Sequence, residues 1–424
     1  MRFRTVAGKA RSRGGLQRAF SHRNFLIYFA GNFPSQIGVW AQRTALGWLA
    51  WKMTDSAFYV GLLGFADLIP IILLSPFSGY LTDRFDRLML GKIITLANIL
   101  VTVALAILGF ANLLTIELLV LFAFLTGVDH AMFQPVRSTL MGALTSKEDL
   151  SAAIAINGFS WNSARFIGPA VAGIALQFTP ETTVFAVNAG LYCWFLVSFW
   201  LLNIQPQERQ DSIQSDGPIR QIIAGYKYIY RHSLIGPLLA ILACASLLTR
   251  PIVELLPVAS GAMFDRAVDG LAMLTSAMGV GAMCAGYWIA QRGKIDGMPR
   301  ITANTLLATM IVLIVFATTP NFYVAVGCMW CIGFQYSTYA TCIQTMIQTV
   351  ADDHMRGRVL ALYGMIWIGF AGIGALIVGG LADIFGLRIP LGVAAGLCLF
   401  VWFWASRKLT HVEAELRATG HISS

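Results

Sequence analysis

The sequence predicts an all-α membrane protein in which twelve transmembrane helices form two pseudo-symmetric six-helix bundles. Three observations support this fold class. Of the 424 residues, 57% are hydrophobic and only 12% are charged, whereas about 25% of the residues in a soluble domain are charged. Apolar stretches of about 20 residues, which is long enough to cross a bilayer, recur along the chain. The third observation is an internal repeat that relates the two halves.

The apolar stretches are expected to be helices, because a helix satisfies its own backbone hydrogen bonds in lipid. Six spans precede a polar linker and six follow it. In chain order they are 25–51, 56–82, 91–111, 115–142, 150–178, 182–204, 233–260, 268–291, 301–318, 321–350, 357–384 and 389–406.

Basic residues are concentrated on one side of the predicted bundle. Most of the 30 Lys and Arg residues lie in the two tails, in the central linker and in the loops after spans 2, 4, 8 and 10. The loops on the other side contain only Lys52, Arg266 and Arg388. Because positively charged loops stay in the cytoplasm, both termini are expected to be cytoplasmic, in a bacterial inner membrane. The net charge of +9 therefore reports topology, and no nucleic-acid partner is expected.

These features divide the chain into five parts. The linker is the longest polar segment between spans, and residues 219–231 have the pattern of an amphipathic helix. That helix either lies at the cytoplasmic surface of the membrane or is a plain connector. The parts are a basic tail (1–23), the N-terminal bundle (24–204), the linker (205–232), the C-terminal bundle (233–406) and a second tail (407–424).

The two halves repeat each other at a nearly constant offset. Arg43 in span 1 recurs 207 residues later as Arg250 in span 7. Such parallel repeats are one architecture of secondary transporters. Three glycines of span 5 recur in span 11, each 206 residues later: Gly158, Gly168 and Gly173 correspond to Gly364, Gly374 and Gly379.

A charged turn, Gly79-Tyr80-Leu81-Thr82-Asp83-Arg84-Phe85-Asp86-Arg87, joins spans 2 and 3. Asp83 would face the N-terminal end of span 11, which carries a positive partial charge, and Gly79 would allow a close approach. We therefore expect a cytoplasmic gate formed by Gly79, Asp83, Arg84 and Arg87. The alternative is that the arginines of the turn mainly set the topology.

The chain resembles the major facilitator superfamily. Gly79-x-Leu81-x-Asp83-Arg84-x-x-Arg87 is similar to the signature of its loop 2–3, and Ile167-Gly168-Pro169-x-x-x-Gly173 is similar to the helix-5 motif of its antiporters. The most similar branch contains the enterobactin exporter and macrolide efflux proteins. The resemblance covers about residues 20–408 and implies twelve helices, a central cavity and alternating access. The branch is indicated by Ser35-Gln36-Ile37-Gly38, Ala45-Leu46-Gly47-Trp48-Leu49, Gln134-Pro135-x-Arg137 and Arg356-Gly357-Arg358-Val359.

The chain also departs from the superfamily pattern. Asp86 stands where the loop motif usually has glycine, as is common in the exporter branch. The usual basic motif of helix 4 is replaced by Thr126-Gly127-Val128-Asp129-His130, so a proton relay through an arginine of helix 4 is not implied. The corresponding loop of the second half, Gln291-Arg292-Gly293-Lys294, lacks the aspartate. We therefore expect the gate motif in one half only.

Polar side chains inside apolar spans are costly and indicate a functional site. Gln36, Trp40 and Arg43 share one face of span 1, and Glu254 follows Arg250 by one turn. Either these arginines are neutralised by neighbouring carboxylates, or they line a cavity suited to an anionic or strongly hydrogen-bonding substrate. The candidate cavity residues are Gln36, Trp40, Arg43, Arg250, Glu254, Gln335 and Tyr339.

A second group lies nearer the middle of the N-terminal spans. A carboxylate in a low-dielectric bundle readily takes up a proton, and histidine titrates near neutral pH. The candidates for proton coupling are Asp67, Asp129, His130 and Arg165. The alternative is a fixed ion pair, for example between Asp129 and Arg165.

Together these features predict a secondary active transporter that exports a small organic molecule, of the drug or siderophore class, in exchange for protons. The seven cysteines lie in apolar spans and are expected to be packing residues. Neither a nucleotide-binding loop nor a metal-ligand cluster is evident, so we expect no metal and no cofactor beyond the proton gradient. The expected partners are the substrate and the lipid bilayer, with the protein as a monomer. The alternatives are an importer or facilitator of an organic anion, and a membrane enzyme or non-transporting scaffold.

Overall fold

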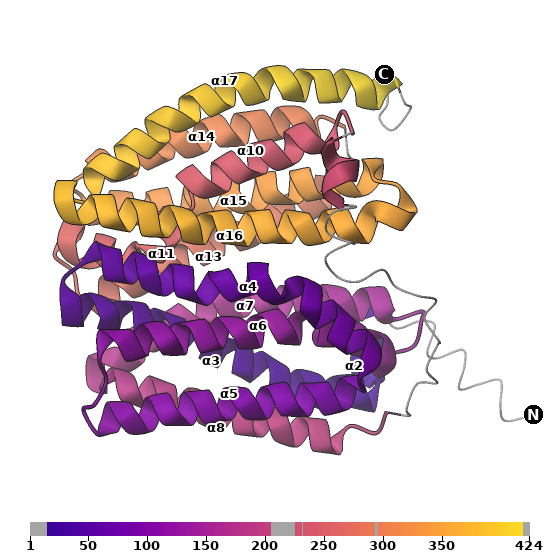
Figure 1. The fold of residues 1–424 in the computed structure, drawn as a ribbon, viewed down its shortest axis with the longest axis vertical. Helices are drawn as coiled ribbons and strands as arrows, with labels where there is room; N and C mark the ends of the chain where they lie inside the picture. Colours follow the sequence, from indigo (N-terminus) through magenta and orange to yellow (C-terminus); the bar gives the residue numbers. More distant parts are fainter. Residues whose placement is uncertain (1–14, 205–224, 231, 293–295, 419–424) are drawn as a thin grey trace, which may run out of the picture.

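The computed structural model describes residues 15–204, 225–230, 232–292 and 296–418. The described chain is helical throughout and contains no strand, which confirms the predicted all-α class. The helices form two groups, with α2 to α8 in one half and α10 to α17 in the other (Figure 1). The first half comprises α2 (Gly15–Ser21), α3 (Arg23–Thr54), α4 (Ala57–Arg84), α5 (Arg87–Phe110), α6 (Ile116–Leu144), α7 (Leu150–Phe178) and α8 (Glu181–Leu201).

The second half begins with a broken helix. The sequence predicted one continuous span at 233–260, but the chain there forms several short segments. Pro251 lacks the N–H that would bond to the carbonyl of Leu247, so the α-helical ladder stops at Arg250. The segments are α10 (Ile235–Leu248), α11 (Pro251–Glu254), α12 (Leu256–Val258) and the π-helical turn η1 (Ala259–Met263).

The remaining helices of this half are continuous. The last one continues well past the predicted end of span 12 at residue 406, because Leu409 and Val412 are buried and Glu413 pairs with Arg300 at 3.1 Å. Of the predicted linker helix, only residues 225–230 lie in the described part, and these are helical. The helices are α13 (Val268–Arg292), α14 (Met298–Thr318), α15 (Phe322–Val350), α16 (Asp353–Phe385) and α17 (Arg388–Ala418).

Every predicted span coincides with a helical segment, but their apolar character differs. Within the described residues, nine helices are long and apolar enough to cross a membrane. The helices α3, α7 and α15 fall short because they bury polar side chains such as Asn32, Ser160 and Gln335. The predicted count of twelve spans therefore stays a prediction for these three.

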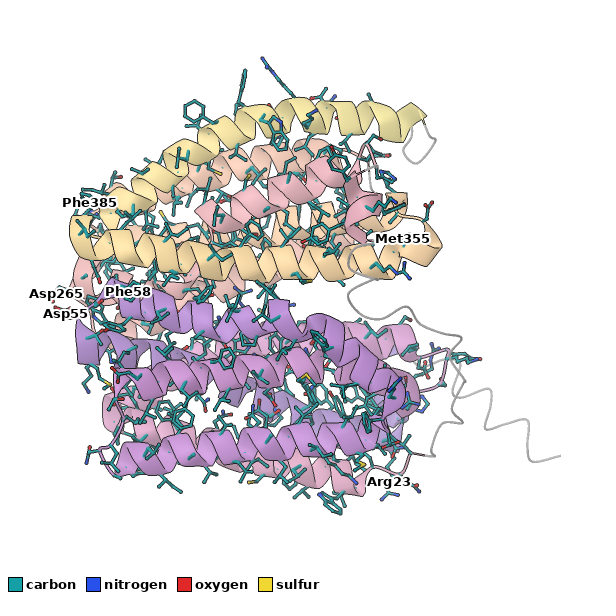
Figure 2. All side chains as sticks on the ribbon, in the orientation of Figure 1. Arg23, Asp55, Phe58, Asp265, Met355 and Phe385 are labelled. Carbon is teal, nitrogen blue, oxygen red and sulfur yellow. The ribbon has the colours of Figure 1, made fainter. Side chains whose placement is uncertain are left out.

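The two ends of the molecule are distinct. Figure 2 places Arg23 and Met355 at one end, which we call the tail end because α2 and the end of α17 lie there (Figure 1). Asp55, Asp265 and Phe385 lie at the opposite end, which we call the loop end. The halves meet mainly along two antiparallel helix pairs, α4 with α16 and α7 with α13.

An ion cluster at the tail end joins three helices of the first half. Asp149, the residue before α7, accepts a hydrogen bond from Arg18 Nε at 2.9 Å, and its other oxygen lies 3.0 Å from His22 Nε2. The hydrogen bonds from His22 and Arg18 hold the pKa of the Asp149 carboxyl below its usual range. The cluster fixes the start of α7 against α2 and α3.

Candidate functional site

A cavity of about 850 Å³ lies between the two halves. Its wall is formed mainly by α3, α4, α6 and α7 of the first half and by α11, α12, α13 and α16 of the second, together with Arg250 and with smaller contributions from α5 and α8. The cavity therefore depends on the relative position of the halves. Nine of the predicted candidates line it: Gln36, Trp40, Arg43, Asp67, Asp129, His130, Arg165, Arg250 and Glu254.

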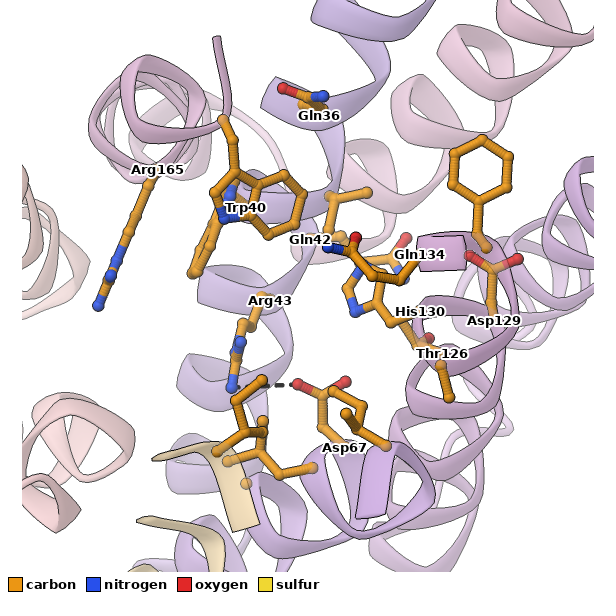
Figure 3. A pocket seen from close by; sticks show the side chains of 18 of the residues that line it. Gln36, Trp40, Gln42, Arg43, Asp67, Thr126, Asp129, His130, Gln134 and Arg165 are labelled. Atoms are coloured by element: carbon orange, nitrogen blue, oxygen red, sulfur yellow. Dashed lines mark ion pairs between the residues drawn. The ribbon is translucent and has the colours of Figure 1, made fainter. Parts of the chain in front are cut away.

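An ion triad crosses the cavity. Arg43 Nη2 donates to Glu254 Oε2 at 2.9 Å and lies 3.1 Å from Asp67 Oδ2. Figure 3 shows the Arg43–Asp67 contact as a dashed line. The carboxylate side chains are only about a tenth exposed, at 9% for Asp67 and 10% for Glu254. Because Glu254 belongs to the second half, Arg43 connects the two halves electrostatically.

Two further arginines lie on tryptophan rings. The guanidinium of Arg165 lies 5.4 Å from the ring centre of Trp40 (Figure 3), and that of Arg250 lies 3.9 Å from the ring centre of Trp367. Arg250 also donates a hydrogen bond to the Trp367 carbonyl at 2.5 Å. Within the described chain neither arginine forms an ion pair. Cation–π contacts of this kind orient a guanidinium without neutralising its charge.

The charged residues of α6 are held by other contacts. Asp129 accepts a hydrogen bond from the side chain of Asn98. His130 lies with its ring centre 6.1 Å from that of Trp161, edge to face. The Asp129–Arg165 pair that the sequence left open is not among the ion pairs of the described residues. The structure instead pairs Asp67, from the same group of candidates, with Arg43.

Two cavity candidates lie elsewhere. Gln335 and Tyr339 are on α15, and neither is among the residues that line the cavity. Tyr339 is fully buried, with its ring centre 5.6 Å from that of Trp367. Polar side chains of α15 thus pack inside the second half, behind the Trp367 that supports Arg250.

Closely packed glycines close the cavity at the loop end. A β-carbon on Gly61 would clash with the Ala375 carbonyl, and one on Gly379 would lie 2.6 Å from the Ala57 carbonyl. Likewise, a β-carbon on Gly173 would clash with Ala272 of α13. Side chains larger than hydrogen would therefore force the halves apart at this end.

The predicted helix-5 motif produces two different contacts. A β-carbon on Gly168 would lie 2.5 Å from Trp40 Cβ, so this glycine brings α7 against α3 within one half. Gly173, one and a half turns on, packs across the halves. Pro169 is buried inside α7, and the helix continues through it from Leu150 to Phe178.

The tail end of the cavity is open. Gly158 of α7 and Gly364 of α16 both line it, and a β-carbon on either would meet no atom within 4 Å. These two glycines correspond to each other in the internal repeat. The repeated glycines therefore divide by position. At the loop end Gly173 packs against Ala272 and Gly379 against Ala57, both in the other half, whereas at the tail end a β-carbon on Gly158 or on Gly364 would meet no neighbour.

One contact between the halves at the loop end was not predicted from the sequence. Asp383, near the end of α16, caps the start of α4 in the other half. Its carboxylate accepts hydrogen bonds from Ser56 Oγ at 2.6 Å and from the backbone N–H of Ala57 at 2.5 Å. The signal was present, because Gly379-x-Leu381-x-Asp383-x-Phe385 repeats the pattern of Gly79-x-Leu81-x-Asp83-x-Phe85. The gate pattern thus occurs twice, at opposite ends of the antiparallel pair α4 and α16.

The predicted gate itself is described in part. Arg87 donates a hydrogen bond to the Thr139 carbonyl at 2.9 Å and so ties the start of α5 to α6. Arg84 is exposed at the end of α4. The surroundings of Gly79 and the side chain of Asp83 lie outside the described residues, so the contact between Asp83 and α16 stays a prediction.

The model of the transmembrane secretion effector family matches residues 17–423. The chain belongs to this family. It is thus a member of the major facilitator superfamily, as the sequence motifs predicted.

Several proteins similar to this chain are named as transporters. The chain is 27% identical to the staphyloferrin A transporter of Staphylococcus aureus (strain NCTC 8325 / PS 47) over 396 residues, which are 90% of this chain and 96% of the relative. The enterobactin exporter EntS of Shigella flexneri is 25% identical over 85% of each chain. The multidrug efflux pump Tap of Mycolicibacterium fortuitum is 22% identical over 81% of this chain and 85% of the relative.

Solved structures show the same fold at lower identity. A variant of the nucleoside transporter NupG superposes with a TM-score of 0.74 at 12% identity, covering 91% of this chain and all of the other. A variant of the peptide transporter POT gives 0.73 at 13% identity, covering 95% and 99%. The family match and these relatives show that the chain is a secondary transporter in a membrane.

Proposed function

We propose that this transporter is a proton-coupled exporter of a small organic molecule, working by alternating access as a monomer. The observation that carries the proposal is the Arg43 triad, because it places two buried carboxylates and one arginine across the interface of the halves. The cavity is complete within one chain, which supports the monomer.

The positive-inside rule gives the orientation. Described basic residues of the segments predicted to be cytoplasmic, such as Arg23, are at the tail end, so we infer that this end faces the cytoplasm and the loop end faces outward. With Gly173 and Gly379 packed at the loop end and Gly158 and Gly364 apart at the tail end, the cavity is accessible from inside. The state described is therefore inward-facing, ready to accept a substrate from the cytoplasm of a bacterial cell.

The triad offers a mechanism for coupling. One arginine faces two carboxylates, so the three groups carry a surplus negative charge when all are ionised. Uptake of one proton by the triad removes that surplus, and Arg43 then needs only one ionised carboxylate as its partner. Because Asp67 lies in the same half as Arg43, the ionic contact with Glu254 across the halves would be weakened, which favours separation of the halves at the loop end.

The names of the relatives support export. Two of them are called an exporter and an efflux pump, and siderophore names occur in two. We therefore propose that the substrate leaves the cell and that protons enter.

The test is exchange in proteoliposomes, with staphyloferrin A, enterobactin and ethidium as probes. We expect counterflow of at least one probe, and faster exit when the medium on the far side of the membrane is acidic. Glu254→Gln should keep counterflow and lose the effect of pH. Glu181→Gln is the matched control, because Glu181 also pairs with a basic residue, Lys52 at 3.2 Å, but at the loop-end surface.

Two results would overturn the proposal. One is transport that ignores the pH gradient in the unmodified protein. The other is acceleration by acid on the same side as the substrate, which would indicate cotransport.

A further inference from the structure

The cavity contains buried hydrogen-bond donors that have no acceptor in the described chain. They are the Nε atoms of Arg165 and Arg250, the indole Nε1 of Trp40 and the amide nitrogen of Gln36. Arg250 and Gln36 are 9% and 3% exposed. Arginine and tryptophan side chains can only donate hydrogen bonds, so a ligand that satisfies this set must be rich in acceptors.

The charges of the cavity wall also favour an anionic ligand. Arg43, Arg165 and Arg250 all line the cavity. Glu254 and Asp67, the carboxylates of the triad, are already bonded to Arg43. Arg165 and Arg250 therefore present two guanidinium groups that lack carboxylate partners of their own in the described chain.

The two arginines come from different halves. Arg165 is on α7, and Arg250 is at the break between α10 and α11, where Pro251 interrupts the helix. Each is oriented by a tryptophan, Trp40 in the first half and Trp367 in the second. A guanidinium group binds a carboxylate through two parallel hydrogen bonds, which makes such a pair selective for planar anionic groups.

We propose that Arg165 and Arg250 form the substrate site, and that the substrate is a polycarboxylate or similar organic anion with one anionic group on each arginine. This inference rests on the proposed transport function and specifies its substrate class. A ligand of this kind would bridge the halves and supply the anionic partners that the two arginines lack.

The experiment measures binding to the purified full-length protein in detergent, without any gradient. The probe is propane-1,2,3-tricarboxylate, and its trimethyl ester is the uncharged control. Quenching of intrinsic tryptophan fluorescence reports binding, because Trp40 and Trp367 adjoin the arginines. We expect the tricarboxylate to bind, with an affinity that falls as salt rises, and the ester to show no binding.

Variants test the two arginines separately. Arg165→Gln and Arg250→Gln should each weaken binding of the tricarboxylate at least tenfold. Arg250→Lys keeps the charge but not the fork, and should retain part of the affinity if Arg250→Gln fails to fold. Arg266→Gln is the matched control, because Arg266 also lies on an aromatic ring, 5.1 Å from the centre of Phe322, but outside the cavity.

Equal binding of the ester, or full affinity in Arg165→Gln, would overturn the inference. Because no gradient is applied, those results would leave proton-coupled export of an uncharged or cationic substrate standing. Conversely, binding that depends on the arginines without any response of transport to pH would refute the coupling and keep the anion site.

Discussion

Replacing Asp383 by alanine should shift the transporter from the inward-facing state toward the outward-facing state. The carboxylate of Asp383 bonds to Ser56 Oγ and to the N–H groups of Ala57 and Phe58 at the start of α4. Asp383 belongs to one half and α4 to the other. The contact can therefore form only while the halves are together at the loop end, and its loss should destabilise that state alone.

The magnitude follows from the contacts. Removing a side chain that caps a helix N-terminus costs about 1 kcal/mol, and removing a negative charge from that end costs about 0.5 kcal/mol at an exposed site. The sum of about 1.5 kcal/mol corresponds to a shift of roughly tenfold in the equilibrium between the two states. An outward-facing population of about 1% would then rise to about 10%.

Distances between spin labels at the loop end measure this shift. Labels on cysteines at Ala111 and Thr318, at the ends of α5 and α14, would report the separation of the halves once the seven native cysteines are replaced. We expect a longer-distance population to grow in Asp383→Ala but not in Asp269→Ala. Asp269 is a control at the same end, where it pairs with Arg266 of its own half at 4.0 Å. Identical distance distributions in the unmodified protein and Asp383→Ala would refute the reasoning.

Three further predictions follow from the closure and from the tail-end cluster. Gly61→Val should favour the outward-facing state, because the side chain would clash with α16. Gly364→Val should favour the inward-facing state, because the side chain would block closure of the tail end. The same pair of spin labels distinguishes the two variants, and equal distance distributions would contradict the assignment of the two states. Asp83→Asn should weaken the outward-facing state and impair transport without loss of folded protein. Accessibility of the cytoplasmic side to a thiol reagent measures the change of state, and unchanged transport would exclude a gate at Asp83. Asp149→Asn should lower the thermal stability at neutral pH. Because the folded-state pKa of Asp149 is lowered, its contribution is complete above the unfolded pKa of about 4 and is lost as pH falls through the folded value; a difference undiminished at pH 2 would contradict this.

Much of the site could be predicted because the free-energy cost of a polar side chain in an apolar span can be recognised from the sequence, without the tertiary structure. A charged or amide side chain in an apolar span is expensive unless it has a role, and this singled out Arg43, Asp67, Arg165 and Arg250 among others. The interaction partners of these residues could not be predicted. The sequence left open an Asp129–Arg165 pair, but Arg43 bonds instead to Asp67 and, across 211 residues of chain, to Glu254.

The sequence predicts which residues share a face of one helix, but not which neighbour that face contacts. Polar residues of α15 suggested a cavity wall, yet Gln335 and Tyr339 face the interior of their own half. A helix surrounded by protein can direct polar groups toward a cavity or toward its neighbours, and spacing along the chain does not distinguish the two. The rotation of α15 is decided by its packing against α13 and α14.

Composition, the sequence motifs and the repeat by themselves determined the helical class, the two halves and the membership of a transporter family, while the orientation stays a prediction from charge placement. These properties depend on the free-energy cost of placing polar groups in lipid, and that cost applies to each segment separately. Tertiary structure alone decided which repeated glycines lie at a close contact between the halves, because Gly173 and Gly379 pack against Ala272 and Ala57 while Gly158 and Gly364 have open space beside them. It also brought Asp383 onto α4 and Arg43 onto Glu254. Those contacts form in one arrangement of the two halves. Because the same sequence must also be compatible with the alternate arrangement of the transport cycle, it does not by itself specify them.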